Sequence, residues 1–413
     1  MRGFAVVCSI GAAAVLAALS LAPVAYGQGD ALPPGVLPAE EAAAGWINLF
    51  DKETTFGWNI LGDAPYKVVD GILTCEGGTG GLLVTTSQFA DYELQVKLRI
   101  SANSSTGLEL RSSLQGHYTE NGTAVVPVTQ PKDSTPDWHT LAVTASGSTL
   151  TATLDGAPVE GVATNRLRGY IGIQFHGDHE GTHKLEVSEA KLKPLNLKSI
   201  FNGTDLTGWN IIPDHKSEFT VVEGALNIKN GNGQIETADV YKDFVLQLDI
   251  FSNGDHLNSG VFYRGPVGVF WKGYESQVRN EWDKPAEGST EPGGIDRRKP
   301  HDFGTGGNYG NQKARMVVSS DREWFHKTLV CDGNHAAVWI NGYQTSDFTD
   351  TRPVVANQDG KAGYVPGPGT IHLQGHDPTT DLSFKNINIM EYPARGGARA
   401  GGGGGRARRE GNQ

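Results

Sequence analysis

The sequence predicts an all-β protein built from two tandem β-sandwiches of the jelly-roll type. No segment shows a sustained apolar period of 3.6 residues, whereas short stretches that alternate apolar and polar residues recur between turns. The chain contains 55 glycines, and many of them lie in these turns. Its 413 residues are too many for one ordinary domain and suit two.

The same order of motifs occurs twice, which sets the boundaries of the two predicted sandwiches. Gly57-Trp58-Asn59-Ile60 corresponds to Gly208-Trp209-Asn210-Ile211, and the segment 138–156 corresponds to 324–342. A Gln-x-His element closes each copy, as Gln174 with His176 and as Gln374 with His376. We therefore expect a first repeat over 46–194 and a second over 197–393.

The flanking segments have compositions that predict no place in either sandwich. Residues 1–27 combine an early Arg2, an apolar run and the small-x-small sequence Ala25-Tyr26-Gly27, which is typical of a cleaved signal peptide. Residues 28–45 form a Pro- and Ala-rich linker, and residues 394–413 form a Gly/Arg tail that we expect to be disordered. The mature protein is expected to be periplasmic or secreted, with no membrane span.

Charge and cysteine content exclude several classes of function. The formal net charge of −11 argues against a nucleic-acid partner, because phosphate binding needs an excess of Lys and Arg. Cys75 and Cys331, the cysteines outside the signal segment, stand at non-equivalent places in the two repeats. We expect them to be small core residues rather than a disulfide or a zinc site.

Three stretches of the second repeat are predicted to place polar side chains on one face of a sheet: 258–264, 273–279 and 369–376. Period-two alternation assigns this face these candidate residues: Phe262, Arg264, Glu275, Gln277, Gln374 and His376. A carboxylate, a guanidinium, an imidazole and amides on one wall supply a base, an anion stabiliser and hydrogen-bonding groups.

Within this wall His376 or Glu275 is the expected base, with His376 preferred, and Arg264 is the expected anion stabiliser. Gln277 and Gln374 are expected to bind substrate hydroxyls, aided by two aromatic residues, Phe262 and Tyr274. A structural reading stays open for each group: an Arg264–Glu275 ion pair, a turn cap at His376, and amides that only complete the sheet face.

The connection 280–315 is long, irregular and rich in Gly, Pro and charge, and its part 301–307 is compatible with a substrate lid. Four side chains are compatible with a divalent metal ion, although their spacing does not require one: His301, His372, His376 and Asp377. We therefore expect no certain cofactor.

The motifs of the second repeat carry a family resemblance: Asn-Ser-Gly-Val-Phe-Tyr-Arg-Gly, Gly-Tyr-Glu-Ser-Gln, Trp-Ile-Asn-Gly-Tyr and Gly-Thr-Ile-His-Leu-Gln-Gly-His. Together with the paired Gly-Trp openings, they resemble the 3-keto-disaccharide hydrolases, also described as 3-keto-glucoside 1,2-lyases or 3-keto-2-hydroxy-glucal hydratases. The resemblance implies a concanavalin-like jelly roll that acts on an oxidised disaccharide or glycoside. The C3 ketone acidifies the C2 proton, so that a base removes it, the C1 substituent leaves, and water then adds.

The first repeat departs from this pattern. It keeps Arg111, Gln174 and His176, but Glu109 replaces Phe262 and no Gly-Tyr-Glu strand is present. We therefore expect a binding or scaffolding role for it.

The alternative for the whole chain is a non-catalytic pair of carbohydrate-binding jelly rolls. An ordinary β-glucanase, which needs two carboxylates flanking the bond, lacks its Glu-x-Asp-x-x-Glu strand here.

Overall fold

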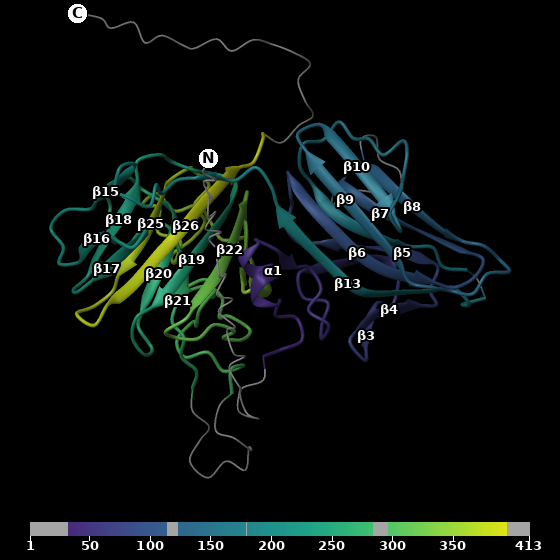
Figure 1. Cartoon of the computed structure of the whole chain (residues 1–413), viewed down its shortest axis with the longest axis horizontal. Helices are drawn as coiled ribbons and strands as arrows, with labels where there is room; N and C mark the ends of the chain where they lie inside the picture. Colours follow the sequence, from purple (N-terminus) through teal and green to yellow (C-terminus); the bar gives the residue numbers. More distant parts are fainter. Residues whose placement is uncertain (1–31, 114–122, 179, 284–295, 395–413) are drawn as a thin grey trace, which may run out of the picture.

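A computed structural model describes residues 32–113, 123–178, 180–283 and 296–394 of the chain. The predicted signal peptide, the Gly/Arg tail from residue 395 and the segment 114–122 of the first repeat lie outside the described residues. Within the described part, the chain forms four antiparallel sheets that pack in two pairs, and the two resulting sandwiches lie side by side (Figure 1).

The first sandwich pairs an eight-stranded sheet with a five-stranded one. The larger sheet has the order β11-β10-β9-β6-β13-β4-β3, and β1 also pairs with β13. Its strands are β1 (Ile47–Asn48), β3 (Lys67–Val69), β4 (Ile72–Glu76), β6 (Tyr92–Ile100), β9 (His139–Ser146), β10 (Thr149–Leu154), β11 (Ala157–Pro158) and β13 (Lys184–Pro194). The smaller sheet has the order β2-β5-β12-β7-β8. Its strands are β2 (Trp58–Asp63), β5 (Gly80–Thr85), β7 (Ser104–Ser112), β8 (Ala124–Gln130) and β12 (Tyr170–Phe175).

The second sandwich repeats this arrangement strand for strand. Its larger sheet has the order β16-β17-β26-β19-β22-β23-β24, and β14 also pairs with β26. Its strands are β14 (Lys198–Ser199), β16 (Glu218–Val222), β17 (Ala225–Lys229), β19 (Phe244–Ser252), β22 (Trp324–Asp332), β23 (His335–Ile340), β24 (Tyr343–Thr349) and β26 (Asp381–Glu391). The smaller sheet has the order β15-β18-β25-β20-β21. Its strands are β15 (Trp209–Ile211), β18 (Gly233–Thr237), β20 (Ser259–Gly265), β21 (Tyr274–Val278) and β25 (Thr370–Gly375).

Alternation along the strands forms the core of each sandwich. In β6, for example, Tyr92, Leu94, Val96, Leu98 and Ile100 are buried, and the residues between them are more exposed. The same pattern places one face of each sheet in a core and leaves the other face for solvent or for function. The predicted all-β class with two tandem jelly-roll sandwiches is confirmed.

The two sandwiches share an apolar interface. The outer face of β23 presents Ala337 and Trp339 to the first sandwich, and both belong to the hydrophobic cluster of that sandwich. The indole of Trp339 donates a hydrogen bond to the carbonyl oxygen of Asn48 at 2.9 Å. Arg168 adds ion pairs to Asp243 and Asp332, each at 3.3 Å. Separating the two halves would expose this buried apolar surface. The function of either half should therefore be tested by substitutions within the full-length protein.

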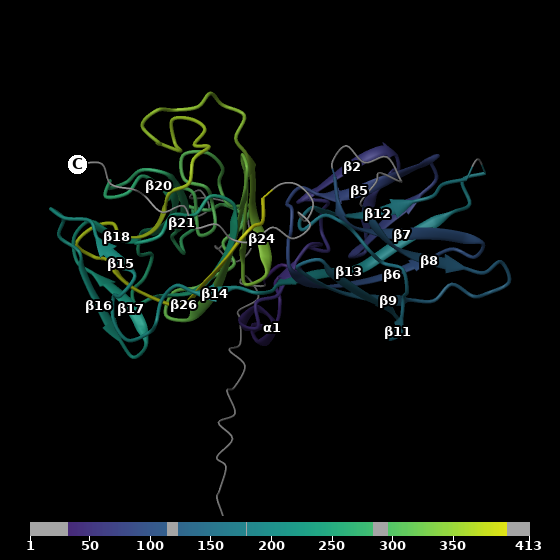
Figure 2. The same ribbon diagram turned by 90° about the horizontal axis from the view of Figure 1, so that it is seen from above.

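The predicted linker 28–45 contains the one helix of the described chain, α1 (Ala39–Ala43), which lies at the junction of the sandwiches (Figure 2). Glu41 of this helix forms an ion pair with Lys191 at 3.1 Å. Cys75 and Cys331 are free and buried, as expected. None of the helices in the described residues is long and apolar enough to cross a membrane.

Candidate active site

The candidate site lies on the outer face of the five-stranded sheet of the second sandwich, a face called the polar wall below. The strand register aligns His372, Phe262 and Glu275 in one row across β25, β20 and β21. The neighbouring row holds Gln277 opposite Gly260, with Gln374 on the adjacent strand. The opposite face of the same strands packs into the core, so the polar wall is set by alternation, as the sequence predicts.

Glu275 is the carboxylate of the polar wall, and it is almost completely buried. Burial raises its pKa to about 8, against the opposing effects of Lys361, a hydrogen bond from the Trp271 side chain, and Lys327. Gly260 gives this carboxylate its room, because a Cβ there would lie 2.5 Å from Glu275 Oε1. A buried carboxyl group that titrates near neutral pH is suited to accept or deliver a proton.

Lys361 supplies the positive charge beside this carboxylate. Its ammonium group lies 4.5 Å from the ring centre of Trp271 and 5.9 Å from that of Phe262. Burial lowers the pKa of Lys361, and the charges of Glu275 and Asp359 oppose that effect. The polar wall thus carries a cation close to a buried carboxyl group, an arrangement that could stabilise a developing anion. Sequence reasoning missed Lys361 and Trp271, because both lie in irregular segments without periodicity.

Two buried amides on the polar wall retain unused hydrogen-bonding capacity. Gln277 Nε2 donates to Asn258 Oδ1 at 2.8 Å, but Gln277 Oε1 has no partner among the described residues. Gln374 Oε1 is likewise buried and unpaired in the described part of the chain. An unpaired buried amide oxygen is costly, so a donor from a bound molecule would satisfy it.

The loop between β20 and β21 folds over one end of the polar wall and is held there by two side chains of β18. Glu236 accepts hydrogen bonds from the backbone N–H of Gly268 at 2.9 and 3.1 Å, and Gln234 accepts one from the N–H of Trp271 at 2.7 Å. His372 is sealed beneath this loop, and burial lowers its pKa to about 4. A neutral, enclosed His372 therefore acts as a positioning residue that contacts Gln234 and Glu236.

The structure does not place Arg264 with the polar wall. The register shifts between Phe262 and Gly265, and Arg264 adopts a left-handed backbone with φ of 53°, so its side chain leaves the alternating pattern. Its guanidinium donates to the backbone oxygens of Lys242, Gly333 and Val365 and pairs with Asp243. The alternative ion pair between Arg264 and Glu275 is absent from the described contacts, and among these contacts it is Lys361 that lies close to Glu275.

Arg264 is instead a buried structural clamp, and we expect Arg264→Ala to destabilise the protein strongly. The change would leave three carbonyl oxygens and a carboxylate without their donor, at a cost of about 3–5 kcal/mol. Such a loss lowers the unfolding temperature by about 10 °C. Arg111 makes the equivalent contacts in the first sandwich, to Ala90, Gly147, Arg166 and Asp91. Arg111→Ala should match the effect in calorimetry, and an unchanged melting temperature for both variants would contradict the clamp.

The two aromatic residues predicted for the site lie on opposite faces of the sheet. Phe262 lies on the polar wall beneath Lys361. Tyr274 does not reach it: the ring stacks on Tyr263 in the core at 5.2 Å, and its hydroxyl donates to Asp350 at 2.7 Å. Tyr274 therefore belongs to the core, because adjacent residues of a strand face opposite sides of the sheet and Glu275 faces the polar wall.

His376 lies one row beyond Gln374 and just past the end of β25 at Gly375. The side chain is exposed, and its Nδ1 contacts the Asp377 carboxylate at 2.9 Å. The backbone N–H of His376 donates to Thr380 Oγ1, which closes the turn. None of its contacts among the described residues is to Glu275. The structure thus favours the turn-cap reading of His376 over the preferred reading as base.

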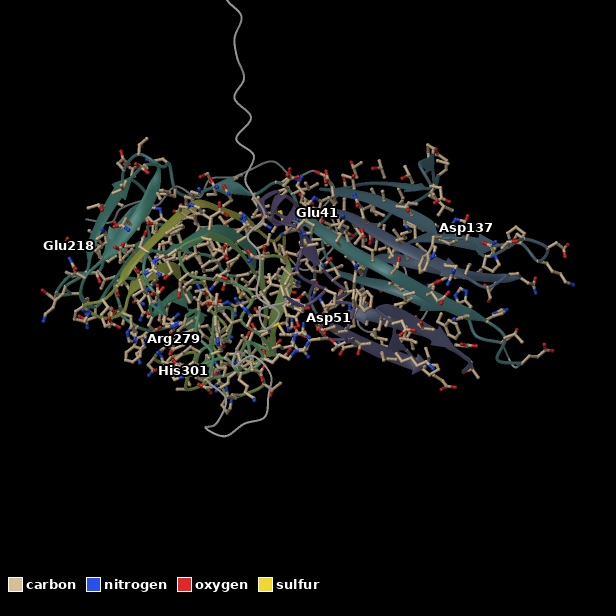
Figure 3. The ribbon with its side chains drawn as sticks, turned by 60° about the horizontal axis from the view of Figure 1, so that its bottom comes forward. Glu41, Asp51, Asp137, Glu218, Arg279 and His301 are labelled. Atoms are coloured by element: carbon tan, nitrogen blue, oxygen red, sulfur yellow. The ribbon has the colours of Figure 1, made fainter. Side chains whose placement is uncertain are left out.

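The predicted lid segment 301–307 has a different role. Backbone hydrogen bonds join Gly306, Gly307 and Tyr309 to the free edge of β21, so that 305–309 extends the sheet. The preceding residues 284–295 lie outside the described chain. Figure 3 shows Arg279 and His301 together at this end of the second sandwich. His301 contacts Asp283 at 2.7 Å rather than the polar wall.

The candidate metal ligands are not gathered in the structure. His372 is buried in the polar wall, His376 and Asp377 form the exposed turn, and His301 pairs with Asp283. Among the described residues, no group of three or more His, Cys, Asp or Glu side chains is placed to hold a metal ion.

The corresponding face of the first sandwich lacks these groups. At the positions of Glu275, Gln277, His372, Gln234 and Glu236, the register places Val125, Pro127, Gly172, Leu82 and Val84. Gln174, the counterpart of Gln374, donates a hydrogen bond from its Nε2 to Glu109 Oε1 at 2.8 Å. Among the described residues of this wall, Glu109 is a buried carboxylate at the position of Phe262, and it accepts hydrogen bonds from Ser112 and Gln174.

Comparison with solved structures returns sandwich proteins of low sequence identity. A protein from Parabacteroides distasonis, provisionally described as a glycosyl hydrolase, is 22% identical, with a TM-score of 0.36 over 47% of this chain and 93% of its own. A carbohydrate-binding module from Bacillus subtilis is 14% identical, with a TM-score of 0.30 over 44% of this chain and 94% of its own. No curated protein is similar enough to serve as a relative.

Comparison with protein families identifies both repeats. The model of the 3-keto-alpha-glucoside-1,2-lyase-like domain matches residues 45–188 and again residues 196–390. These two segments coincide with the two sandwiches and together cover most of the chain. The chain therefore belongs to the family of 3-keto-alpha-glucoside-1,2-lyase-like domains and carries two tandem copies.

Proposed function

We propose that the second sandwich cleaves 3-keto-glycosides by elimination followed by hydration, with Glu275 as the base. Membership of the family of 3-keto-alpha-glucoside-1,2-lyase-like domains supports this choice of substrate class. The observation that carries the proposal is the buried Glu275 carboxyl group, with its pKa raised to about 8, beside the cation of Lys361. A base and an anion stabiliser at one place are what abstraction of a proton next to a ketone requires.

In the first step, ionised Glu275 takes the C2 proton, and the electron pair of the C–H bond forms the enolate of the C3 ketone. Lys361 stabilises the negative charge on the enolate oxygen. The enolate then expels the C1 substituent, which leaves as the aglycone after protonation, and a 3-keto-2-hydroxy-glucal remains. Water adds to C1 and a proton returns to C2, so the net reaction is hydrolysis. Glu275 gives the abstracted proton to the departing aglycone, then takes a proton from the attacking water and delivers that solvent-derived proton to C2.

The other groups of the polar wall bind and orient the sugar. The unpaired amide oxygens of Gln277 and Gln374 are ready to accept hydrogen bonds from sugar hydroxyls. Trp271 is 45% exposed at the rim and presents a ring that suits the apolar face of a pyranose. This division of roles leaves one carboxylate for chemistry, unlike the two carboxylates of an ordinary glycosidase.

The test is to incubate the full-length mature protein with a 3-keto-glucoside and with the same glucoside unoxidised, each with and without a chelator. The proposal predicts aglycone release from the oxidised substrate alone. Tight binding of either sugar without turnover would support the alternative, a non-catalytic carbohydrate-binding protein. Loss of release in the chelator arm would show that a divalent metal ion assists.

We expect Gln374→Ala to weaken substrate binding by about tenfold in KM and to change kcat little. The amide donates and accepts for sugar hydroxyls but takes no part in the proton transfer, and one lost hydrogen bond is worth about 1.4 kcal/mol. Gln174→Ala in the first sandwich is the matched control and should leave both constants unchanged. Equal losses in the two variants would refute the assignment of substrate to the second sandwich.

The first sandwich is assigned a scaffolding or binding role in this proposal. Among the described residues, its wall has Val125 and no carboxylate at the position of Glu275, and its shared apolar interface supports the second sandwich. The predicted signal segment further supports export of the mature protein to the periplasm or the medium. Mass spectrometry of the exported protein should then give a chain that begins near Gln28.

A further inference from the structure

A cavity lies on the opposite side of the second sandwich from the polar wall. It occupies the outer face of the eight-stranded sheet and has a volume of about 410 Å³. Residues of β17, β19, β22 and β26 line it. Trp324, Phe251, Ser383 and Asn227 form a single row across these four strands, called the outer row below.

The outer row begins with two aromatic side chains at the surface. The ring centres of Phe251 and Trp324 are 5.3 Å apart, and Trp324 is 37% exposed. The ammonium group of Lys385 lies 3.8 Å from the centre of the Trp324 ring and fixes its position. A strand face that is open to solvent gains little from two such rings, whereas an aromatic surface stacks well on the apolar face of a sugar.

The other end of the outer row is a polar network. The amide nitrogens of Asn227 and Asn253 both donate to the Asp381 carboxylate and to Ser383 Oγ, at 3.0–3.2 Å. Their amide oxygens accept no hydrogen bond within the described part of the chain. The side chains are thereby held in fixed orientations with acceptors to spare, which suits hydroxyl donors of a ligand.

The charges around the cavity balance, which favours a neutral ligand. Two cations, Lys229 and Lys385, line it together with two anions, Glu223 and Asp381. The four strands of the outer row span about 14 Å at the usual strand spacing, room for two to three pyranose units.

The first sandwich shows what the same place looks like when it is closed. The register places Arg99, Glu186 and Thr74 at the positions of Phe251, Ser383 and Asn227, with Trp138 at that of Trp324. Arg99 stacks on Trp138 at 4.7 Å and pairs with Glu186 at 2.6 Å. This ion pair consumes the polar groups of the row in the first sandwich, whereas the second sandwich keeps hydrogen-bond acceptors at Asn227 and Asn253.

We propose that the outer row of the second sandwich is a carbohydrate-binding site for a neutral oligosaccharide chain, separate from the polar wall. Such a site would hold the protein on a glycan while the polar wall acts on small oxidised glycosides. It does not depend on the reaction proposed for the polar wall.

The test is titration calorimetry of the full-length protein with cellohexaose, maltohexaose and, as the charged probe, hexagalacturonate. We expect at least one neutral hexasaccharide to bind, and Trp324→Ala and Asn253→Ala each to weaken that binding at least tenfold. Trp138→Ala, the matched change in the first sandwich, should leave binding unchanged, as should Glu275→Gln.

Both variants alter partly exposed side chains, and circular dichroism verifies that they remain folded. Aglycone release from a small 3-keto-glucoside should be the same in Trp324→Ala as in the unmodified protein. The proposal would be overturned if neither neutral hexasaccharide bound, or if hexagalacturonate alone bound. Binding that survives both substitutions would overturn it as well.

Discussion

Replacing Glu275 by Gln is expected to lower turnover of a 3-keto-glucoside by about 10²-fold or more. The amide keeps the size of the carboxyl group and its hydrogen-bonding reach, so the fold should be retained while the base is lost. Because burial raises the pKa of Glu275 to about 8, the unmodified enzyme should become more active as pH rises through that value. The ascending limb should disappear in Glu275→Gln, which initial rates between pH 6 and 10 would show.

Glu109→Gln is the control for this change, because Glu109 is a buried carboxylate on the wall of the first sandwich. It should leave both the rate and its pH profile unaltered. If Glu275→Gln turned over substrate as fast as the unmodified protein, Glu275 would not be the base. His376→Ala would then become the decisive variant, since the sequence pattern favours that residue.

Replacing Lys361 by Met should also lower kcat about 10²-fold, because the enolate would lose the charge that stabilises it. The methionine side chain keeps most of the apolar stem of lysine but removes the ammonium group, and with it the cation–π contacts with Trp271 and Phe262. Burial lowers the pKa of Lys361, so in the unmodified enzyme activity should fall at a pH below the usual range of lysine.

Lys272→Met provides the matched control, since its ammonium group pairs with Asp359 at 2.7 Å instead of facing Glu275. This variant should stay within a few-fold of the unmodified rate. Comparable losses from Lys272→Met and Lys361→Met would show that general charge, and not the placement of Lys361, governs the rate.

Strand alternation predicts much of the polar wall but fails where the backbone departs from regular pleating. Glu275, Gln277 and Gln374 share a face, as period two predicts, because their strands are regular in this part. Arg264 lies only two residues after Phe262, yet the bulge between Phe262 and Gly265 turns its side chain away. An identical left-handed φ of 53° at Arg111 shows that the bulge belongs to both repeats.

Strand alternation in the sequence cannot predict which loop residues reach the polar wall. Lys361 comes from the irregular connection between β24 and β25, and Trp271 from the loop between β20 and β21, so their approach to Glu275 depends on tertiary packing alone. The apolar run Val267–Trp271 is the sequence feature that could have indicated a binding surface in this loop, since a solvent-facing loop seldom carries so many apolar residues. The interface through Trp339 also has no local signature, because alternation does not distinguish solvent from a second domain.

The most direct test of the account is to run the cleavage of a 3-keto-glucoside in D₂O and to examine C2 of the released 3-keto-sugar by NMR at early times. Elimination and hydration through the C2 anion predict deuterium at C2 of each product molecule, faster than free 3-keto-glucose exchanges in the same buffer. Aglycone release with C2 still carrying its original hydrogen would contradict proton abstraction by Glu275 and indicate direct hydrolysis.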